Sequence, residues 1–470
     1  MNGFIKSCAL VLAACLLAGC ASAPDLPPQP TLDELLAETN AAHQAVTKPQ
    51  VDASQYRTRP APDEETVDYF TGGGQTTVDF DPDAVVTAAQ AAEDMEYLFD
   101  AFRALYGPYD FFGGDGTFGR HKAELQARLE EKESWTAAEV QDLLLEGLRF
   151  FEDGHFAVNG QRPNPWKVPF FFRESAFYRM EDGYIREDGK RVASVDGYED
   201  LDELFKRSIS PEGEIVYYPI LLEEDVLQAD DVTLTIHYAD GSAQTLTAEP
   251  FVRYKEQIEG DAITEYHKDG EIPVFTIDSC YDGAMDEIAA GAIMVARYPV
   301  GIVDLRANLG GSDSVGNTWL RQYTYTDTER PMYRNQYLMN VFSGGSGAED
   351  GWIENDRVLI VLTSKNIASA AETFVDMAHN VENVLFIGEN TWGAQVTSAA
   401  YHVQLPNSGC VVTMGHGLFE VPQDWDYYEE LRGYQPDLWV PAGEAEELAV
   451  KLMENLGAMQ AEGEASSPAA

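Results

Sequence analysis

From about residue 265 onwards, the sequence repeats one pattern: a short apolar run, a polar or glycine-containing loop, and then a stretch with helical periodicity. The apolar runs at 300–305, 358–363 and 384–388 are rich in Val, Ile and Leu, which is typical of strands buried on both faces. Because strands that alternate with helices pair in parallel, this region predicts an α/β fold with a parallel sheet.

The remaining sequence predicts further regions around this core. Helical periodicity near 95–105 and a capping box from Thr136 to Glu139 indicate a helical N-terminal domain. Alternation at 232–238 favours a β-rich insert. A proline-rich stretch indicates a spacer with one short helix near 32–45. The predicted division is 1–20 signal peptide, 21–80 spacer, 81–160 helical domain, 161–260 β-rich domain, 261–450 α/β core, and 451–470 helix end with a disordered tail.

The charge of the chain excludes one class of partner. Lys and Arg total 31 against 80 Asp and Glu, which gives a net charge of −49. Such a surface repels nucleic acid, so we expect no nucleic-acid partner. With 44% hydrophobic residues, the chain still has enough apolar side chains to fold.

The first 20 residues have the pattern of a bacterial lipoprotein signal. Lys6 precedes an apolar run that ends in Leu-Ala-Gly-Cys at 17–20. Acyl chains on Cys20 would hold the protein at a membrane. The sequence therefore predicts an extracytoplasmic protein that is lipid-anchored to a bacterial cell membrane.

Outside the signal, the only cysteines are Cys280 and Cys410. They form either one disulfide or two buried thiols, and the sequence leaves both open. No zinc, calcium or nucleotide-binding motif occurs. We therefore expect no metal and no organic cofactor.

Two loops in the predicted core have residue types suited to chemistry. Ser369 follows a strand and a short loop at the start of a helix, where the hydroxyl and backbone N–H groups face one point. The segment Asp-Leu-Arg-Ala-Asn-Leu-Gly-Gly at 304–311 also follows a strand, and its glycines allow close approach of a ligand. A helix cap and a tight turn are the alternative interpretations.

Four ordered motifs resemble those of the C-terminal processing peptidases, also called tail-specific proteases. They are Asp-Leu-Arg-x-Asn-x-Gly-Gly at 304–311, Ser-Ala-x-Glu at 369–372, Gly-Glu-x-Thr-x-Gly at 388–393 and Gly-x-x-Pro-Asp-x-x-Val at 433–440. The resemblance covers roughly 265–445 well and 85–160 loosely. It implies a ClpP/crotonase-like catalytic core with Ser369 as nucleophile, a helical N-terminal domain and a β-rich, PDZ-like insert.

One departure from the family decides which catalytic set the resemblance implies. The lysine that follows the Gly-Glu-x-Thr-x-Gly motif in Ser-Lys members is Ala394 here. A second branch resembles the tricorn protease core and uses Ser, His and Glu. Its Asp-Gly-His turn is matched by residues 153–155, which makes His155 the base. The Glu before its Gly-x-x-Pro-Asp motif is matched by Glu430, with Glu429 as the fallback.

This set also makes chemical sense by itself. A serine hydroxyl becomes a good nucleophile when an imidazole accepts its proton, and the imidazole needs an acceptor that fixes its tautomer. By the resemblance, the oxyanion would be held by backbone N–H groups of Gly310 or Gly311 and of Ala370.

Two other residues compete for the role of base. His416 stands between two glycines, which we interpret as a glycine turn. Lys365, four residues before Ser369, is more simply a solvated loop lysine.

The sequence thus predicts a serine endopeptidase that acts on peptides or unfolded proteins through an acyl-enzyme on Ser369. A non-catalytic lipoprotein that keeps the fold as a peptide-binding or scaffold module is the main alternative. An esterase with the same three residues is a further one, because the triad does not choose between ester and amide.

Overall fold

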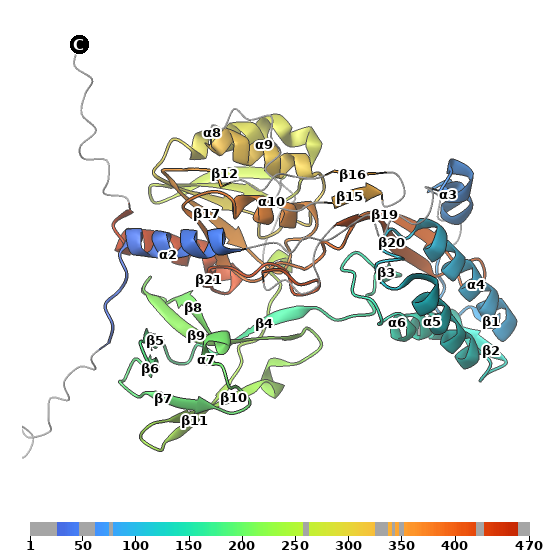
Figure 1. The fold of residues 1–470 in the computed structure, drawn as a ribbon, viewed down its shortest axis with the longest axis horizontal. Coiled ribbons are helices and arrows are strands. Elements are labelled where there is room, and N and C mark those ends of the chain that lie inside the picture. Colours follow the sequence, from blue (N-terminus) through green and yellow to red (C-terminus); the bar gives the residue numbers. More distant parts are fainter. Residues whose placement is uncertain are drawn as a thin grey trace, which may run out of the picture.

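A computed structural model describes residues 26–46, 62–74, 79–256, 263–324, 337–340, 344–346, 352–419 and 427–458. Cys20, the predicted lipidation site, lies outside the described residues. Figure 1 shows a mixed α/β molecule in which the core lies at the top, with a helical region to its right and a β-rich region below it.

The central sheet has six strands in the order β12-β13-β14-β17-β18-β21. Only β12 and β13 pair antiparallel; the other neighbours pair in parallel, which confirms the predicted parallel core. The bounds are β12 Thr264–Asp269, β13 Ile272–Ile277, β14 Val300–Asp304, β17 Val358–Thr363, β18 Val384–Gly388 and β21 Leu438–Trp439.

Helices cover both faces of this sheet, because its strands are apolar on both sides. Val303 packs on one face with α8, α9 and α10, whereas its neighbour Ile302 packs on the other face with α2 and α11. The bounds are α2 Leu32–Ala45, α8 Met285–Val295, α9 Asp313–Thr324, α10 Ala370–Ala378 and α11 Ala445–Asn455.

The predicted spacer contains more structure than its proline content indicates. The expected helix near 32–45 is confirmed as α2, and it packs on the core rather than standing free. Asn40 exchanges hydrogen bonds with Asn383, and His43 contacts Asp437 at 2.9 Å between Nε2 and Oδ1. A second helix, α3 (Glu64–Thr71), was not predicted.

The helical region has one helix more than the sequence pattern predicts. The bounds are β1 Val85–Thr87, α4 Ala88–Leu105, α5 Gly114–Leu129, β2 Ser134–Thr136 and α6 Ala137–Gly147. The capping box at Thr136 is confirmed, but α5 was missed, since its polar stretch carries only three buried side chains besides Gly114. Phe151 is buried beyond the end of α6.

A long hairpin from the C-terminal half of the chain completes the core of this helical region. Val403, Val412 and Met414 of the hairpin pack among the aromatic residues of α4 and α5, and Figure 1 shows the hairpin beside these helices. The strands in its sheet are β3 Ala157–Val158, β15 Tyr337–Asn340, β16 Gly344–Ser346, β19 Thr397–Gln404 and β20 Val411–Phe419.

Residues 167–247 form the β-rich region, as two small sheets. The alternation predicted at 232–238 is confirmed in β10, where every second residue is buried. The bounds are β4 Lys167–Phe171, β5 Phe177–Met180, β6 Gly183–Arg186, β7 Val192–Val195, α7 Leu201–Leu204, β8 Phe205–Ile209, β9 Ile215–Glu224, β10 Thr233–Tyr238 and β11 Ala243–Thr247. Ser208 on β8 donates to the Trp439 carbonyl at 2.5 Å, which joins this region to the core.

Of the two cysteine alternatives, the structure has free thiols. Cys280 and Cys410 are both buried and unpaired, in separate apolar clusters. In the described part of the chain, no helix combines the length and apolar character needed to cross a membrane.

Substitution of Asp94 tests how much its hydrogen bonds to the β19–β20 hairpin stabilise the packing of this hairpin on the helical region. Its buried carboxylate on α4 accepts hydrogen bonds from the Asn407 and Ser408 backbone N–H groups, both at 2.8 Å, and from the Asn407 side chain at 3.0 Å. We expect Asp94→Ala to lower the free energy of unfolding by about 3 kcal/mol, since it leaves three donors without an acceptor. Denaturant unfolding measures this. Asp100→Ala, at an exposed position of the same helix, should change the free energy by less than about 0.5 kcal/mol; an equal effect would contradict the attachment.

Candidate active site

Ser369 is accessible within a segment that is otherwise buried. From Val358 to Val381, every residue except Ser369 is buried. Ser369 lies between the 364–368 loop after β17 and the first residue of α10. Its φ of 55° lies in a region that residues other than glycine rarely adopt. Such strain at the junction of a strand and a helix is typical of an exposed nucleophile.

The buried carboxylate of Glu372 holds the start of α10 against the 391–394 loop. Its oxygens accept from four donors: Ser369 N at 3.2 Å, Thr391 Oγ1 at 2.6 Å, and the backbone N–H groups of Gly393 and Ala394 at 2.8 Å each. Burial raises the pKa of Glu372, and these donors oppose the shift. The sequence marked Glu372 only as a motif residue; its place in the first turn of a helix was the available signal of a capping role.

The predicted Asp-Gly-His turn lies against the same loop. Asp153 accepts from His155 N at 2.9 Å, and from Tyr106 and Thr397 hydroxyls at 2.8 Å each. A Cβ at Gly154 would lie 2.5 Å from the Gly393 carbonyl oxygen and 2.7 Å from Ala394 Cβ. The loop that contacts Ser369 through Glu372 therefore also contacts the residue before His155.

His155 has the protonation state that a general base needs. Desolvation lowers the pKa of its imidazole, so the ring is neutral at pH 7. Nδ1 is buried and has no hydrogen-bond partner among the described residues. No hydrogen bond joins His155 to Ser369 in the part of the chain that the structure describes.

Glu430 does not make the contact predicted for it. Its Oε1 accepts from Gly154 N at 2.7 Å. Its Oε2 accepts from the backbone N–H groups of Gln395 and Val396, both at 3.0 Å, and from the Tyr428 hydroxyl at 2.6 Å. Both oxygens are thus engaged, and the expected hydrogen bond to His155 is not formed. Instead, Glu430 joins the His155 turn to the 395–396 backbone through hydrogen bonds.

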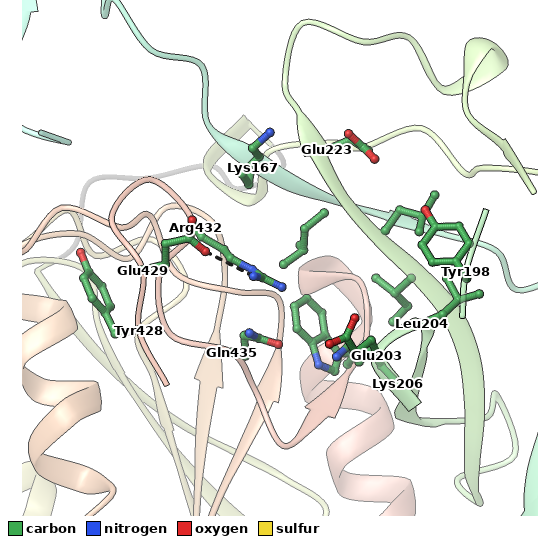
Figure 2. Close-up of a pocket in the computed structure, with 15 residues that line it drawn as sticks. Lys167, Tyr198, Glu203, Leu204, Lys206, Glu223, Tyr428, Glu429, Arg432 and Gln435 are labelled. Carbon is green, nitrogen blue, oxygen red and sulfur yellow. Dashed lines mark hydrogen bonds and ion pairs between the residues drawn. The ribbon is translucent and has the colours of Figure 1, made fainter. Parts of the chain in front are cut away.

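The neighbouring glutamate, proposed as the fallback, faces the other way. Glu429 pairs with Arg432 at 3.3 Å, and its side chain is 53% exposed. The pair lies at a cavity of about 720 Å³ between the core and the β-rich region, and Lys206 of β8 lines the opposite side (Figure 2). Of the two candidates, only Glu430 points toward the His155 turn.

The predicted oxyanion residues lie next to Ser369. A Cβ at Gly310 would lie 2.8 Å from Ser369 Cβ and 3.1 Å from Ala370 N. The Gly310 N–H donates to Asn308 Oδ1 at 2.8 Å. Among the described residues, the Gly311 N–H forms no hydrogen bond. Of the two glycines, Gly311 therefore has the backbone N–H that is more available to bind an oxyanion. The sequence had left this choice undecided.

Both residues that competed with His155 as base differ from the sequence interpretation. His416 lies within strand β20, with its ring tilted against that of Tyr401, and not in a glycine turn. Lys365 is 1% exposed rather than solvated. Its Nζ donates to the carbonyl oxygens of Thr391, Trp392, Leu431 and Arg432, at 2.8 to 3.3 Å.

Four carbonyl acceptors suit an ammonium group, although burial lowers the pKa of Lys365. A lysine held in this way joins the 391–392 and 431–432 backbones. It acts as a structural cation, and the sequence missed it because burial of a polar loop residue depends on segments far away in the chain.

Comparison with known proteins agrees with the motifs. Residues 275–440 match the family model described as Peptidase family S41, which confirms the resemblance to C-terminal processing peptidases. No curated protein sequence matches the chain.

Solved structures with similar folds are remote from this chain. Mature CPAF is 12% identical with a TM-score of 0.42, covering 80% of this chain and 99% of that one. The photosystem II D1 C-terminal processing protease is 14% identical with a TM-score of 0.35, covering 75% and 93%. Tricorn protease is 14% identical with a TM-score of 0.36, covering 79% and 37%.

Gly154→Ala tests whether the contact between the His155 turn and the 393–394 loop matters. The new Cβ has no room, so the turn must shift by about 1 Å or more, and we expect casein hydrolysis to fall at least about 100-fold. A matched control is Gly119→Ala, at a position where no atom lies within 4 Å of the added Cβ. Thermal melts show whether each variant folds. Unchanged hydrolysis by folded Gly154→Ala would exclude a catalytic role for this turn.

Proposed function

We propose that this protein is a serine peptidase that hydrolyses peptide bonds in peptides or unfolded proteins through an acyl-enzyme on Ser369. The observation that carries the proposal is the accessible Ser369, whose backbone φ is positive, in a segment that is buried everywhere else. The family match over residues 275–440 supports it.

In this mechanism, Ser369 Oγ attacks the carbonyl carbon while neutral His155 accepts the hydroxyl proton. The imidazolium then gives the proton to the leaving amine, and water releases the acyl group by the same route in reverse. The N–H groups of Ala370 and Gly311 stabilise the oxyanion, assisted by the positive end of the α10 dipole.

Glu430 has two functions in this proposal. In the resting protein it positions His155 through Gly154. During the reaction, its charge stabilises the imidazolium from across the turn. A direct hydrogen bond to Nδ1 forms only if the turn moves on substrate binding, as catalytic contacts often tighten in the complex.

The surroundings of the catalytic core are part of the proposal. Lipidation at Cys20 would tether the enzyme to a bacterial membrane outside the cytoplasm. The core would have the ClpP/crotonase-like arrangement, and residues 161–260 would be a PDZ-like domain placed beside the substrate path.

A non-catalytic module is the second candidate, and one observation favours it. Ser369 and His155 share no hydrogen bond, and Nδ1 of His155 lacks a partner among the described residues. A fold that has lost catalysis but still binds peptides would have these features.

Hydrolysis of casein and of fluorogenic peptides by a 21–470 protein decides between the two. We expect Ser369→Ala and His155→Ala to abolish hydrolysis, and Glu430→Gln to lower kcat by about 100-fold or more. Glu429→Gln is the matched control and should retain activity. If the folded wild type equals Ser369→Ala on peptides and on esters, the binding module is correct; hydrolysis of esters alone identifies an esterase.

The pH dependence of kcat/KM separates the contribution of Glu430. Burial raises the pKa of Glu430 to about 8, and the nearby Asp153 adds to this. The carboxylate that stabilises imidazolium therefore forms as the pH rises through about 8, whereas His155 is already neutral there. We expect kcat/KM to increase between pH 7 and 9 in the wild type and to lack this increase in Glu430→Gln. The same increase in both proteins would assign it to another group.

A further inference from the structure

An arginine and two tryptophans form a cluster directly beside the His155 turn. The Arg162 guanidinium carbon lies 4.1 Å from the ring centre of Trp166 and 4.3 Å from that of Trp392. The two rings are 3.8 Å apart, in a T-shaped contact. Arg162 Nε donates to the Gly154 carbonyl at 3.0 Å. Stacking and this hydrogen bond fix the plane of the guanidinium.

The cluster has hydrogen-bond donors without acceptors. The indole nitrogens of Trp166 and Trp392 are buried and have no hydrogen-bond partner in the described part of the chain. Within the described residues, the two terminal nitrogens of Arg162 donate to no group, and Arg162 forms no ion pair. Its neighbour Arg253, 4.1 Å from the same Trp166 ring, differs because Asp225 pairs with it at 3.4 Å.

Unpaired positive charge in this setting favours an anion. Burial and the positive charge of the nearby Arg253 lower the pKa of Arg162 to about 9. The carboxyl groups of Asp153, Asp225 and Glu430 raise this pKa, but they do not offset the decrease. The half-buried guanidinium is thus less stable here than in water, and a carboxylate at its free nitrogens would restore the lost interaction.

The position of the cluster ties it to the reaction. Arg162 contacts the residue before His155, and its charge contributes to lowering the pKa of that histidine. Trp392 belongs to the loop whose Ala394 contacts both Glu372 and Gly154. A chain of contacts through Gly154, Ala394 and Glu372 therefore links Arg162 to Ser369.

We propose that Arg162, on its platform of Trp166 and Trp392, is a subsite that binds a carboxylate of the substrate next to the scissile bond. This inference rests on the proposed peptidase function. The net charge of −49 repels acidic peptides at long range. The subsite at Arg162 would attract a substrate carboxylate at short range despite this repulsion. The carboxylate is an acidic side chain or a free C-terminus, which share this chemistry.

The test starts from one peptide that the wild type cleaves. Asp or its isostere Asn is placed, one position at a time, at each of the three positions on either side of the cleaved bond. Each peptide is made with a free and with an amidated C-terminus. We expect kcat/KM to be about tenfold higher for Asp than for Asn at one position. Arg162→Gln should make the two equal, and Arg162→Lys should retain part of the ratio. Preference for the free C-terminus alone would identify that source instead.

The ratio of the two peptides separates recognition from positioning. Arg162→Gln also removes the hydrogen bond to Gly154, which lowers kcat for both peptides equally and leaves their ratio unchanged. Arg253→Gln, the matched control, should keep the ratio because Asp225 already neutralises Arg253. An unchanged ratio in folded Arg162→Gln overturns the subsite.

A measurement of peptide binding tests the subsite without requiring hydrolysis. A fluorescein-labelled heptapeptide with a central Asp or Asn is titrated with the Ser369→Ala protein, and anisotropy gives Kd. We expect about tenfold tighter binding of the Asp peptide, lost in Ser369→Ala/Arg162→Gln. If no peptide is hydrolysed, the proposed function fails while this difference still supports the subsite; equal Kd values for both peptides overturn it.

Discussion

The buried carboxylate of Glu372 is the interaction on which the arrangement around Ser369 depends. An acceptor with two oxygens satisfies four donors from two segments, the start of α10 and the 391–394 loop. Burying a charge is costly unless it is fully hydrogen-bonded. The need to satisfy this one carboxylate therefore sets where the loop must lie, and the loop in turn sets the position of the His155 turn.

Two further buried ionisable groups extend this constraint. Lys365 joins the 391–392 backbone to 431–432, and Glu430 joins the His155 turn to 395–396. Each group binds backbone atoms that no regular helix or strand satisfies, so these irregular loop backbones remain buried with their polar groups paired. Among the described residues, unpaired polar atoms remain at His155 Nδ1 and at the terminal nitrogens of Arg162, where substrate is expected.

The hairpin β19–β20 explains how distant parts of the chain share one site. It extends from the α/β core, packs among the aromatic residues of α4 and α5, and carries Thr397, which donates to Asp153 of the turn. The helical region therefore positions His155 only because the hairpin is part of its core. A chain in which these segments folded separately would not hold the His155 turn against the 393–394 loop.

The sequence by itself determined the local elements and the residues at their ends. Strands β14, β17 and β18, the capping box of α6, the turn at 153–155 and the place of Ser369 before α10 all follow from periodicity and end signals, which short segments carry within themselves. Only the tertiary structure decided that Glu430 holds Gly154 instead of His155, that Lys365 is buried, that the cysteines are unpaired and that α2 packs on the core. Each of these depends on burial and on partners dozens to hundreds of residues away, and a local pattern contains no record of them.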